Sequence, residues 1–264
     1  MGDHKKVLIT GASRGIGAAI ALILHNSGYS VIGTYYPLDK TDDRIAGIEY
    51  LPLDFNDEKS ISALAQKVKS VDILINNVGQ SQIGPVEETP VDRIKKDFQV
   101  NLFGMISLTQ AFLPGMRERK SGTIINIGSM AGKFAIPFQS IYVATKASVA
   151  GFSWALRNEV MNFGIKVVVI EPNDIKTTIE PTVNLKDGSV YQDSVTKMKG
   201  VRDKNMSHAP GPEIVGKKVA KILKKNKPRP FYTVGGIGPL FVFLKRLLPD
   251  KVIEKLLKKN YGLK

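Results

Sequence analysis

Short apolar runs alternate with helical segments along most of this chain, and this alternation restricts the fold more than any other feature. We predict strands over residues 7–10, 30–35, 50–53, 72–75, 123–127, 166–170 and 231–234. We predict helices over residues 15–26, 58–68, 91–117, 140–162 and 213–225. Most of the strands are continuous apolar runs, which is typical of strands covered on both faces. The order indicates βαβ units, hence an α/β fold with a doubly wound parallel sheet.

The chain has 264 residues, of which 43% are apolar, so it can bury a core large enough for a single domain. We assign residues 1–235 to that domain. Periodicity fails over residues 178–212, where Gly, Pro, Asp, Ser and Lys are mixed. A long irregular segment is uncommon in a compact domain unless it has a function, so we interpret it as a substrate lid or loop. Residues 236–264 form a basic, amphipathic C-terminal extension.

The absence of cysteine excludes disulfides, thiolate nucleophiles and cysteine metal sites, and it suits a reducing cytoplasm, where we expect this protein. The polar residues 1–6 run straight into an apolar strand, so we expect no signal peptide. No apolar run approaches the roughly 20 residues that span a bilayer. His4, His25 and His208 lack the spacing of metal ligands, and we expect no bound metal.

The net charge of +14 is concentrated near the C-terminus, since residues 213–264 hold 14 Lys and Arg against three acidic residues. Nucleic-acid binding needs basic residues along a groove or strand, usually with a recognisable motif, and no such motif is present. We therefore expect no nucleic-acid partner. The tail is either a solvated basic region or one that contacts an anionic membrane surface or an acidic partner. Its apolar residues at 240–248 and 252–257 would face lipid, the protein's own core or a second subunit.

A glycine-rich segment, Thr-Gly-Ala-Ser-Arg-Gly-Ile-Gly at residues 10–17, lies between the first predicted strand and the first predicted helix. Glycines here allow a sharp turn and let backbone N–H groups approach a pyrophosphate at the helix N-terminus. The spacing is G-x-x-x-G-x-G rather than the commoner G-x-G-x-x-G. By itself such a segment can be only a tight connection, but its position directly after a strand favours a nucleotide site.

Tyr142 and Lys146 are four residues apart in a predicted helix and therefore lie on one face. A tyrosine with a pKa of ~10 exchanges protons poorly at neutral pH. A neighbouring ammonium lowers the pKa of the phenol, and a shift to ~7 corresponds to about 4 kcal/mol. The pair can then donate a proton to a developing alkoxide. In isolation the same spacing is usually a solvated helix face.

Four polar or glycine-rich features follow four different predicted strands. They are the turn at Gly11, the Asn-Asn-Val-Gly segment at residues 76–79, Ser129 and Pro172. Ligands of open α/β sheets bind outside the carboxyl ends of the strands. We therefore expect one site to combine the glycine-rich segment with Ser129, Tyr142 and Lys146.

These motifs resemble those of the short-chain dehydrogenase/reductase family, over about residues 5–235. The resemblance rests on T-G-A-S-R-G-I-G (10–17), L-D (53–54), N-N-V-G (76–79), Asn101, Ser129, Y-V-A-T-K (142–146) and P-N-D-I-K-T (172–177). It implies a Rossmann fold, a homo-oligomer and an oxidoreductase that transfers hydride between a nicotinamide and an alcohol or ketone. The tail is similar to those of hydroxysteroid- and retinol-dehydrogenase-like members, which implies a lipophilic small-molecule substrate.

The resemblance also implies roles for individual residues. Tyr142 would be the general acid/base, with Lys146 lowering its pKa and bonding the nicotinamide ribose. Ser129 would hold the substrate oxygen, and Asn101 would support a water-linked proton relay, although Asn101 could also simply bond backbone within its helix. The residues implied to bind the cofactor are Gly11, Ser13, Arg14, Gly15, Ile16, Gly17, Tyr35, Asp54, Asn76, Gly79, Tyr142, Lys146, Pro172, Ile175 and Thr177.

The chain departs from the family pattern at two positions, where Asn173 replaces a glycine and Val78 an alanine. Either change could reshape the cofactor pocket without removing a catalytic group. The cofactor itself is expected to be NADP(H) rather than NAD(H), because a preference for NAD needs a carboxylate near the end of the second strand. That strand ends in Thr-Tyr-Tyr-Pro (34–37), Asp39 comes too late, and Arg14 would pair with a 2′-phosphate unless it is merely solvated.

Three alternative functions remain open. A serine hydrolase is disfavoured because residues 128–132, Gly-Ser-Met-Ala-Gly, do not form G-x-S-x-G. A catalytically silent nucleotide-binding or scaffold protein would be expected to lack Tyr142 or Lys146. A 3-oxoacyl-thioester reductase is an alternative within the same family, because residues 10–17 and 31–34 are also close to that class.

Overall fold

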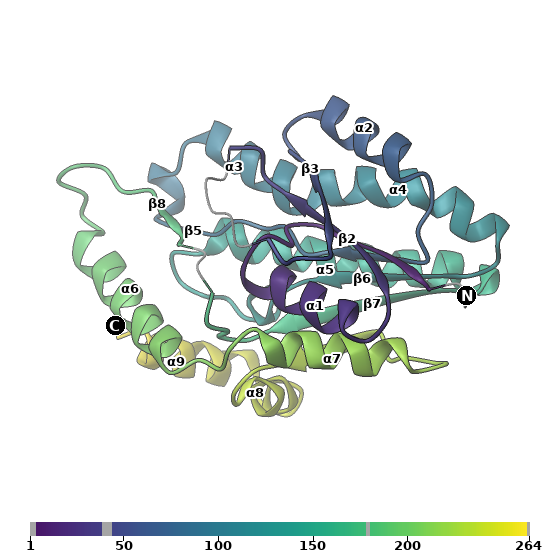
Figure 1. Ribbon diagram of the computed structural model, residues 1–264. Coiled ribbons are helices and arrows are strands. Elements are labelled where there is room, and N and C mark those ends of the chain that lie inside the picture. Colours follow the sequence, from purple (N-terminus) through teal and green to yellow (C-terminus); the bar gives the residue numbers. More distant parts are fainter. Residues whose placement is uncertain (1–3, 39–43, 178–179, 263–264) are drawn as a thin grey trace.

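The computed structural model describes residues 4–38, 44–177 and 180–262. Within them, seven parallel strands form one sheet in the order β3-β2-β1-β4-β6-β7-β9 (Figure 1). The strands are β1 Lys6–Ile9, β2 Ser30–Tyr35, β3 Glu49–Pro52, β4 Ile73–Asn76, β6 Gly122–Ile127, β7 Ile165–Pro172 and β9 Phe231–Val234. The order reverses between β1 and β4, which is the topological switch point of a doubly wound sheet. The predicted fold class is confirmed.

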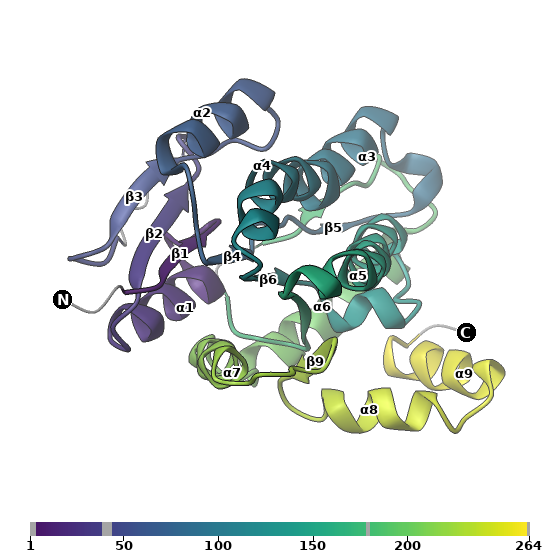
Figure 2. The ribbon, with the colours of Figure 1, turned by 90° about the vertical axis from the view of Figure 1, so that its right-hand side faces the viewer.

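Helices cover both faces of this sheet (Figure 2). They are α1 Gly15–His25, α2 Glu58–Val68, α3 Val91–Phe98, α4 Gly104–Glu118, α5 Ser140–Val160, α6 Gln192–Ser207, α7 Glu213–Leu223, α8 Gly238–Lys245 and α9 Asp250–Asn260. Side chains alternate along β1, so Val7 and Ile9 pack with α1 and α7, whereas Leu8 packs with α2, α4 and α5. Both faces of β1 are therefore buried, which explains its continuous apolar run.

The long helix predicted over residues 91–117 contains an irregular turn. A π-helical segment, Gln99–Phe103, separates α3 from α4. Single π turns inside α-helices often occur at functional sites because they change which backbone groups are paired. Asn101 lies within this turn and is buried.

The expectation of an irregular segment over residues 178–212 requires correction. The segment contains β8, Thr182–Val183, and the 16-residue helix α6. Only Val195 and Met198 of α6 are buried, so the helix has too few apolar positions for a visible periodicity. Strand β8 pairs with β5, Gln82–Ile83, and this small sheet attaches the segment to the domain (Figure 1).

The C-terminal helices α8 and α9 pack on the domain rather than extending from it. Ile253 is buried, and the Lys245 ammonium donates a hydrogen bond to the backbone oxygen of Lys133. Tyr261, just after α9, packs with the cluster around Val195 and Met198 of α6. The described part of the chain contains no helix with the length and apolar character needed to cross a membrane.

Candidate active site

A cavity of about 1420 Å³ opens at the carboxyl ends of β1, β4, β6 and β7. Its lining includes Gly11 after β1, Gly79 after β4, Ser129 after β6 and Pro172 at the end of β7. These four features come from distant parts of the sequence and meet at the switch point of the sheet. The cavity therefore lies where ligands of doubly wound sheets bind.

The glycine-rich turn fits a pyrophosphate. Gly11 and Gly15 have positive φ angles of 65° and 56°, which favour glycine. A Cβ on Gly17 would come within 2.0 Å of the Gly11 backbone oxygen, so the turn can lie close against α1 only with glycine there. Helix α1 has no side-chain cap and no acidic residue in its first turn. Its N-terminal N–H groups are thus suited to an anion at this edge of the cavity.

Asn77, which the sequence argument did not single out, joins the turns after β1 and β4. Its side-chain nitrogen donates to the backbone oxygens of Thr10 (3.0 Å) and Gly11 (3.1 Å). The Thr10 hydroxyl accepts from the backbone nitrogens of Asn77 (2.9 Å) and Val78 (3.2 Å). These four bonds fix the glycine-rich turn relative to the next strand of the sheet.

Asn76, which we expected to bind the cofactor, does not line the cavity. It is buried behind the cavity, where its Nδ2 donates to Thr109 Oγ1 at 3.2 Å and to Asn126 Oδ1 at 2.8 Å. These bonds connect β4 with β6 and α4. Asn77, rather than Asn76, lines the cavity. Gly17 also lies outside the lining and acts through close packing of the turn.

Ser129, Tyr142 and Lys146 meet in the cavity. Ser129 follows β6, and its Oγ accepts a hydrogen bond from the backbone nitrogen of Ala131 at 3.1 Å. The Lys146 Nζ lies 5.9 Å from the centroid of the Tyr142 ring, one helical turn away on α5. The same ammonium donates to the backbone oxygen of Ile127 at 3.1 Å, at the end of β6.

Burial controls the protonation of this group. It raises the pKa of Tyr142, and the hydrogen-bonding hydroxyl of Ser129 and the charge of Arg202 offset this only in part. Burial also lowers the pKa of Lys146 to about 8. The pKa of Tyr142 therefore moves in the opposite direction to the one expected from a neighbouring ammonium, because desolvation of the phenolate is the larger effect. A phenol that stays protonated at neutral pH can donate a proton to a developing alkoxide.

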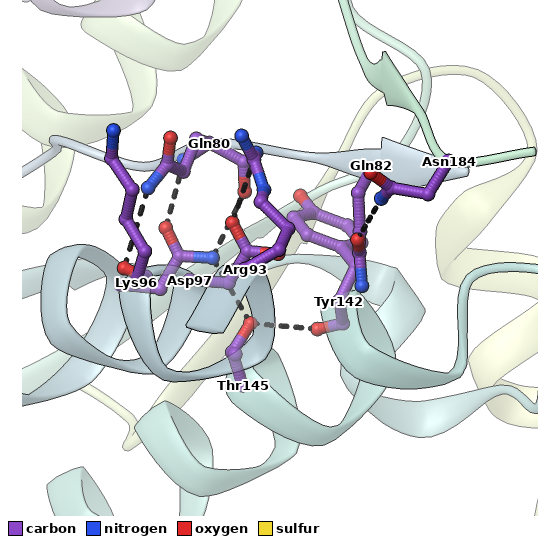
Figure 3. A network of polar contacts seen from close by, with 9 residues as sticks. Gln80, Gln82, Arg93, Lys96, Asp97, Tyr142, Thr145 and Asn184 are labelled. Atoms are coloured by element: carbon purple, nitrogen blue, oxygen red, sulfur yellow. Dashed lines mark hydrogen bonds and ion pairs between the residues drawn. The ribbon is translucent and has the colours of Figure 1, made fainter. Parts of the chain in front are cut away.

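Asn101 supports this group from behind the cavity wall. Its Oδ1 accepts from the backbone nitrogen of Gln80 at 2.8 Å, and its Nδ2 donates to the Gln80 oxygen at 2.9 Å and to Thr145 Oγ1 at 3.1 Å. Thr145 in turn donates to the backbone oxygen of Tyr142 (Figure 3). Asn101 thus bonds a different segment, not the backbone of its own helix, and connects the π turn with α5.

The far end of the cavity is lined by Arg14, Tyr35 and Asp54. Asp54 Oδ1 accepts a bond from the Asn56 backbone nitrogen at 2.8 Å. The Arg44 guanidinium lies 5.2 Å from the centroid of the Tyr35 ring, a contact that strand and helix patterns did not reveal. Asp39 lies outside the described residues.

The last residue of β7 and the residues after it also line the cavity, among them Pro172, Ile175 and Thr177. Asn173, which replaces a glycine of the family pattern, does not have a positive φ. Its backbone nitrogen donates to the Val234 oxygen at 2.8 Å. The position therefore accepts an asparagine without backbone strain. The other departure, Val78, packs against the turn, where its Cγ2 would lie 3.0 Å from a Cβ on Gly11.

Helices α6, α8 and α9 enclose the remaining side of the cavity. Their apolar contributions are Met198, Met206, Phe241, Ile253, Leu256 and Leu257. Asp174, Arg202 and Tyr261 add polar groups on this side. Sequence reasoning assigned a role to none of the three. Asp174 lies within the motif at residues 172–177 but was given no function of its own, and no motif connects Arg202 or Tyr261 with Tyr142.

The short chain dehydrogenase family model matches residues 5–188 of this chain. The chain belongs to the short-chain dehydrogenase/reductase family. A 3-ketodihydrosphingosine reductase from Bacteroides thetaiotaomicron is 32% identical to it, over 98% of this chain and 98% of the relative. A short-chain dehydrogenase structure from Streptomyces avermitilis is 32% identical, with a TM-score of 0.83 over 97% of this chain and 96% of that one. A serine dehydrogenase complexed with NADP+ is 26% identical, with a TM-score of 0.73 over 88% of this chain and 95% of that one.

Short-chain dehydrogenases/reductases bind nicotinamide cofactors, and this protein is an oxidoreductase of that family. The arrangement of the residues agrees with membership of this family and argues against a serine hydrolase. A hydrogen bond with the Ser129 hydroxyl lowers the pKa of the Tyr142 phenol. His208 also lines the cavity, but its Nδ1 is engaged by the Lys204 oxygen at 2.9 Å and by Ser207 at 3.0 Å.

Proposed function

We propose that this protein is an NADP(H)-dependent oxidoreductase that interconverts a lipophilic ketone and the corresponding alcohol. The observation that carries the proposal is the meeting of Ser129, Tyr142 and Lys146 in one cavity with a glycine turn suited to a pyrophosphate. When bound, the nicotinamide supplies the hydride for reduction or accepts it in oxidation. The glycine turn, Tyr35, Asp54, Gly79, Pro172, Ile175 and Thr177 are the residues that would hold the cofactor.

The side chains supply positioning and a proton. The Ser129 hydroxyl holds the carbonyl oxygen of the substrate, and the Tyr142 phenol donates its proton to that oxygen as negative charge develops there. The Lys146 ammonium would orient the cofactor ribose and return a proton to Tyr142 after each turnover. Asn101, which bonds Gln80 and Thr145, would hold the backbone beside which a water-linked proton relay starts. The raised pKa of Tyr142 favours the direction of ketone reduction at neutral pH, because the phenol is then in its donor form.

Two guanidinium groups, one that lines the cavity and one that contacts the cavity residue Tyr35, support a preference for NADP(H). Arg14 lines the cavity beside Tyr35, and Arg44 lies over the Tyr35 ring. The described residues at the end of β2, Thr34 to Leu38, include no carboxylate to hold a ribose 2′-hydroxyl. A guanidinium binds a phosphate through charge-assisted hydrogen bonds. We therefore assign Arg14 to the 2′-phosphate.

The apolar wall formed by α6, α8 and α9 supports a lipophilic substrate. The similarity to a 3-ketodihydrosphingosine reductase, an enzyme whose name denotes a lipid ketone, agrees with this class. A 3-oxoacyl thioester is the alternative ketone substrate, and it would place a long polar carrier outside the cavity.

A panel of ketones tests the proposal. Steroid, retinoid, acyl-thioester, small and long-chain ketones are each incubated with NADPH or NADH, and cofactor absorbance is followed. We expect a long-chain ketone to be reduced with a higher kcat/KM for NADPH than for NADH. Arg14→Ala should lower the ratio of the NADPH value to the NADH value. Binding of NADPH without turnover on any ketone would favour a silent nucleotide-binding protein, and a clear NADH preference would refute the cofactor assignment.

We also propose that α8 and α9 contact an anionic membrane surface. Phe243 on α8, Leu247 between the helices and Val252 on α9 are exposed. Arg246, Lys251 and Lys255 lie among them and are also exposed. Apolar side chains with surrounding cations suit the headgroup region of an anionic bilayer, and a lipophilic substrate would then reach the cavity directly.

A further inference from the structure

Asp174 is a charged group on the substrate side of the cavity that the proposed reaction does not use. It follows β7, between Pro172 and Ile175, and it lines the same cavity as Tyr142. Its side chain is partly buried. In the described part of the chain no hydrogen bond or ion pair to its carboxylate is found. The carboxylate oxygens are not among the buried atoms that lack a partner, so they remain accessible from the cavity, where a ligand can supply the partner.

The charges around Asp174 favour a cationic ligand. The Arg202 guanidinium lowers the pKa of the Asp174 carboxyl, although burial has the larger effect and raises it. That guanidinium is itself 3.0 Å from Asp203 and 4.0 Å from Glu180. Arg202 is thus paired with two other carboxylates, and Asp174 has no ion-pair partner of its own among the described residues. The Asp174 carboxylate would repel an anionic substrate group and attract a cationic one.

Tyr261 lies on the same side of the cavity. Burial, and secondarily the charge of Asp174, raises the pKa of Tyr261 to about 12. Its phenol therefore stays neutral and brings a hydroxyl and an aromatic ring close to the carboxylate without adding charge. Tyr261 is held there by packing with Val195 and Met198 of the lid helix α6. The end of the C-terminal tail is thus part of the substrate side of the site.

Apolar residues surround this charged group. Met198, Phe241, Ile253 and Leu257 line the cavity from α6, α8 and α9. A substrate that matches both features carries an apolar chain and a cationic group close to its reacting carbon. The common biological group of this kind is a protonated amine.

We propose that Asp174, with Tyr261 beside it, binds a protonated amine close to the reacting carbonyl, so that the substrates are lipophilic amino ketones and their amino alcohols. This assignment rests on the proposed reductase function, whose site it refines. Asp174 is a specificity-determining residue in this account, because an ion pair to a substrate ammonium in a water-poor cavity raises affinity for the aminated substrate alone.

Matched substrates and matched variants test the assignment. The substrates are ketones with a dodecyl chain that carry an amine on the first or the second carbon from the carbonyl, and the same ketone without an amine. Reduction by NADPH is measured at neutral pH, because the raised pKa of Asp174 would let an acidic buffer protonate the carboxylate. The variants are Asp174→Asn and, as control, Asp203→Asn, which removes an exposed carboxylate that pairs with Arg202 outside the cavity. Dodecylamine is added as a competitive inhibitor in a separate arm.

We expect the wild-type kcat/KM for one of the amino ketones to exceed that for the plain ketone by about 10-fold or more. Asp174→Asn should abolish this preference and weaken dodecylamine inhibition to the same extent, while reduction of the plain ketone stays within about 3-fold of wild type. Retained reduction of the plain ketone also shows that the variant is folded. Asp203→Asn should keep the preference for the amine.

Two results would overturn the assignment. One is wild-type reduction of amino and plain ketones at equal kcat/KM, which leaves the reductase function standing. The other is an amine preference that survives in Asp174→Asn. Failure of the reductase function is a different result, namely no reduction of any ketone by a protein that binds NADPH.

Discussion

Lys146 shows how a residue with a proposed catalytic role can oppose folding. Its side chain is 5% exposed, and burial lowers its pKa from 10.5 to about 8. A shift of that size corresponds to roughly 3 kcal/mol of lost stability at neutral pH. One hydrogen bond to the Ile127 oxygen offsets part of this loss. The burial of Lys146 thus lowers stability, in keeping with the chemical role that we propose for it.

We therefore predict that Lys146→Met removes turnover without destabilising the protein. The free energy of unfolding at neutral pH should stay within about 1 kcal/mol of wild type or rise by up to ~2 kcal/mol, because an apolar side chain of similar length replaces a desolvated charge. Urea unfolding measures it. A loss of more than ~2 kcal/mol would show that the ammonium stabilises the fold.

The lowered pKa of Lys146 also predicts the direction in which stability changes with pH. The folded pKa of about 8 lies below the unfolded value of 10.5, so the unfolded chain binds more protons between these values. The stability of the wild type should therefore rise with pH across this interval, relative to Lys146→Met. Urea titrations of both proteins at several alkaline pH values measure this difference. An unchanged difference would mean that Lys146 keeps an ordinary pKa in the folded protein.

The glycine turn is the element on which the proposed nucleotide site depends. A Cβ on Gly17 would lie 2.0 Å from the Gly11 oxygen and 2.7 Å from the Asn77 side-chain nitrogen. The first of these is backbone and cannot move without opening the turn. Gly151 on α5, by contrast, has no described atom within 4 Å of the position that a Cβ would take.

We predict that Gly17→Ala lowers the free energy of unfolding by about 1–3 kcal/mol through overpacking and weakens NADPH binding by ~10-fold or more. The control Gly151→Ala should raise stability by roughly 0.5–1 kcal/mol, as expected for an open helical position. Thermal unfolding and fluorescence titration measure both quantities. Wild-type NADPH affinity in Gly17→Ala would contradict the role assigned to the turn.

Sequence patterns predicted most elements but not helix α6, which lines part of the cavity. Strand β2 and helix α2 have the predicted bounds, because continuous apolar runs and strong amphipathicity mark buried elements. Helix α6 escaped prediction because it buries only Val195 and Met198. Ser129, Tyr142 and Lys146 were found through spacing and motif. Burial in the folded molecule raises the pKa of Tyr142. The fold also brings Asp174 near Tyr261, which is 87 residues further along the chain. No local sequence pattern reveals either effect.

At the scale of the whole molecule, the C-terminal tail both lines the cavity and exposes apolar side chains. The tail that supplies Ile253, Leu256 and Leu257 to the cavity also exposes Phe243 and Leu247, which are 57% and 65% exposed. Removing the tail would therefore damage the substrate site together with any membrane contact. Point substitutions of exposed residues separate the two effects.

We predict that wild-type protein sediments with vesicles containing phosphatidylserine and that Phe243→Ser/Leu247→Ser reduces this binding by about 10-fold or more, since two apolar side chains are lost from the contact. The control is Val190→Ser, which removes an apolar residue of 88% exposure outside the tail. High salt should weaken wild-type binding. Equal sedimentation of all three proteins, or none by the wild type, would mean that the tail is only a wall of the cavity.

The most direct test of the account compares wild type with Tyr142→Phe in NADPH-dependent reduction of the best ketone of the panel. Removing the phenolic proton donor should lower kcat by about 100-fold or more, because general acid catalysis contributes factors of this size. Affinity for NADPH, followed by fluorescence titration, should remain within about 3-fold of wild type. If Tyr142→Phe keeps more than about a tenth of the wild-type kcat, Tyr142 is not the proton donor and the proposed mechanism is contradicted.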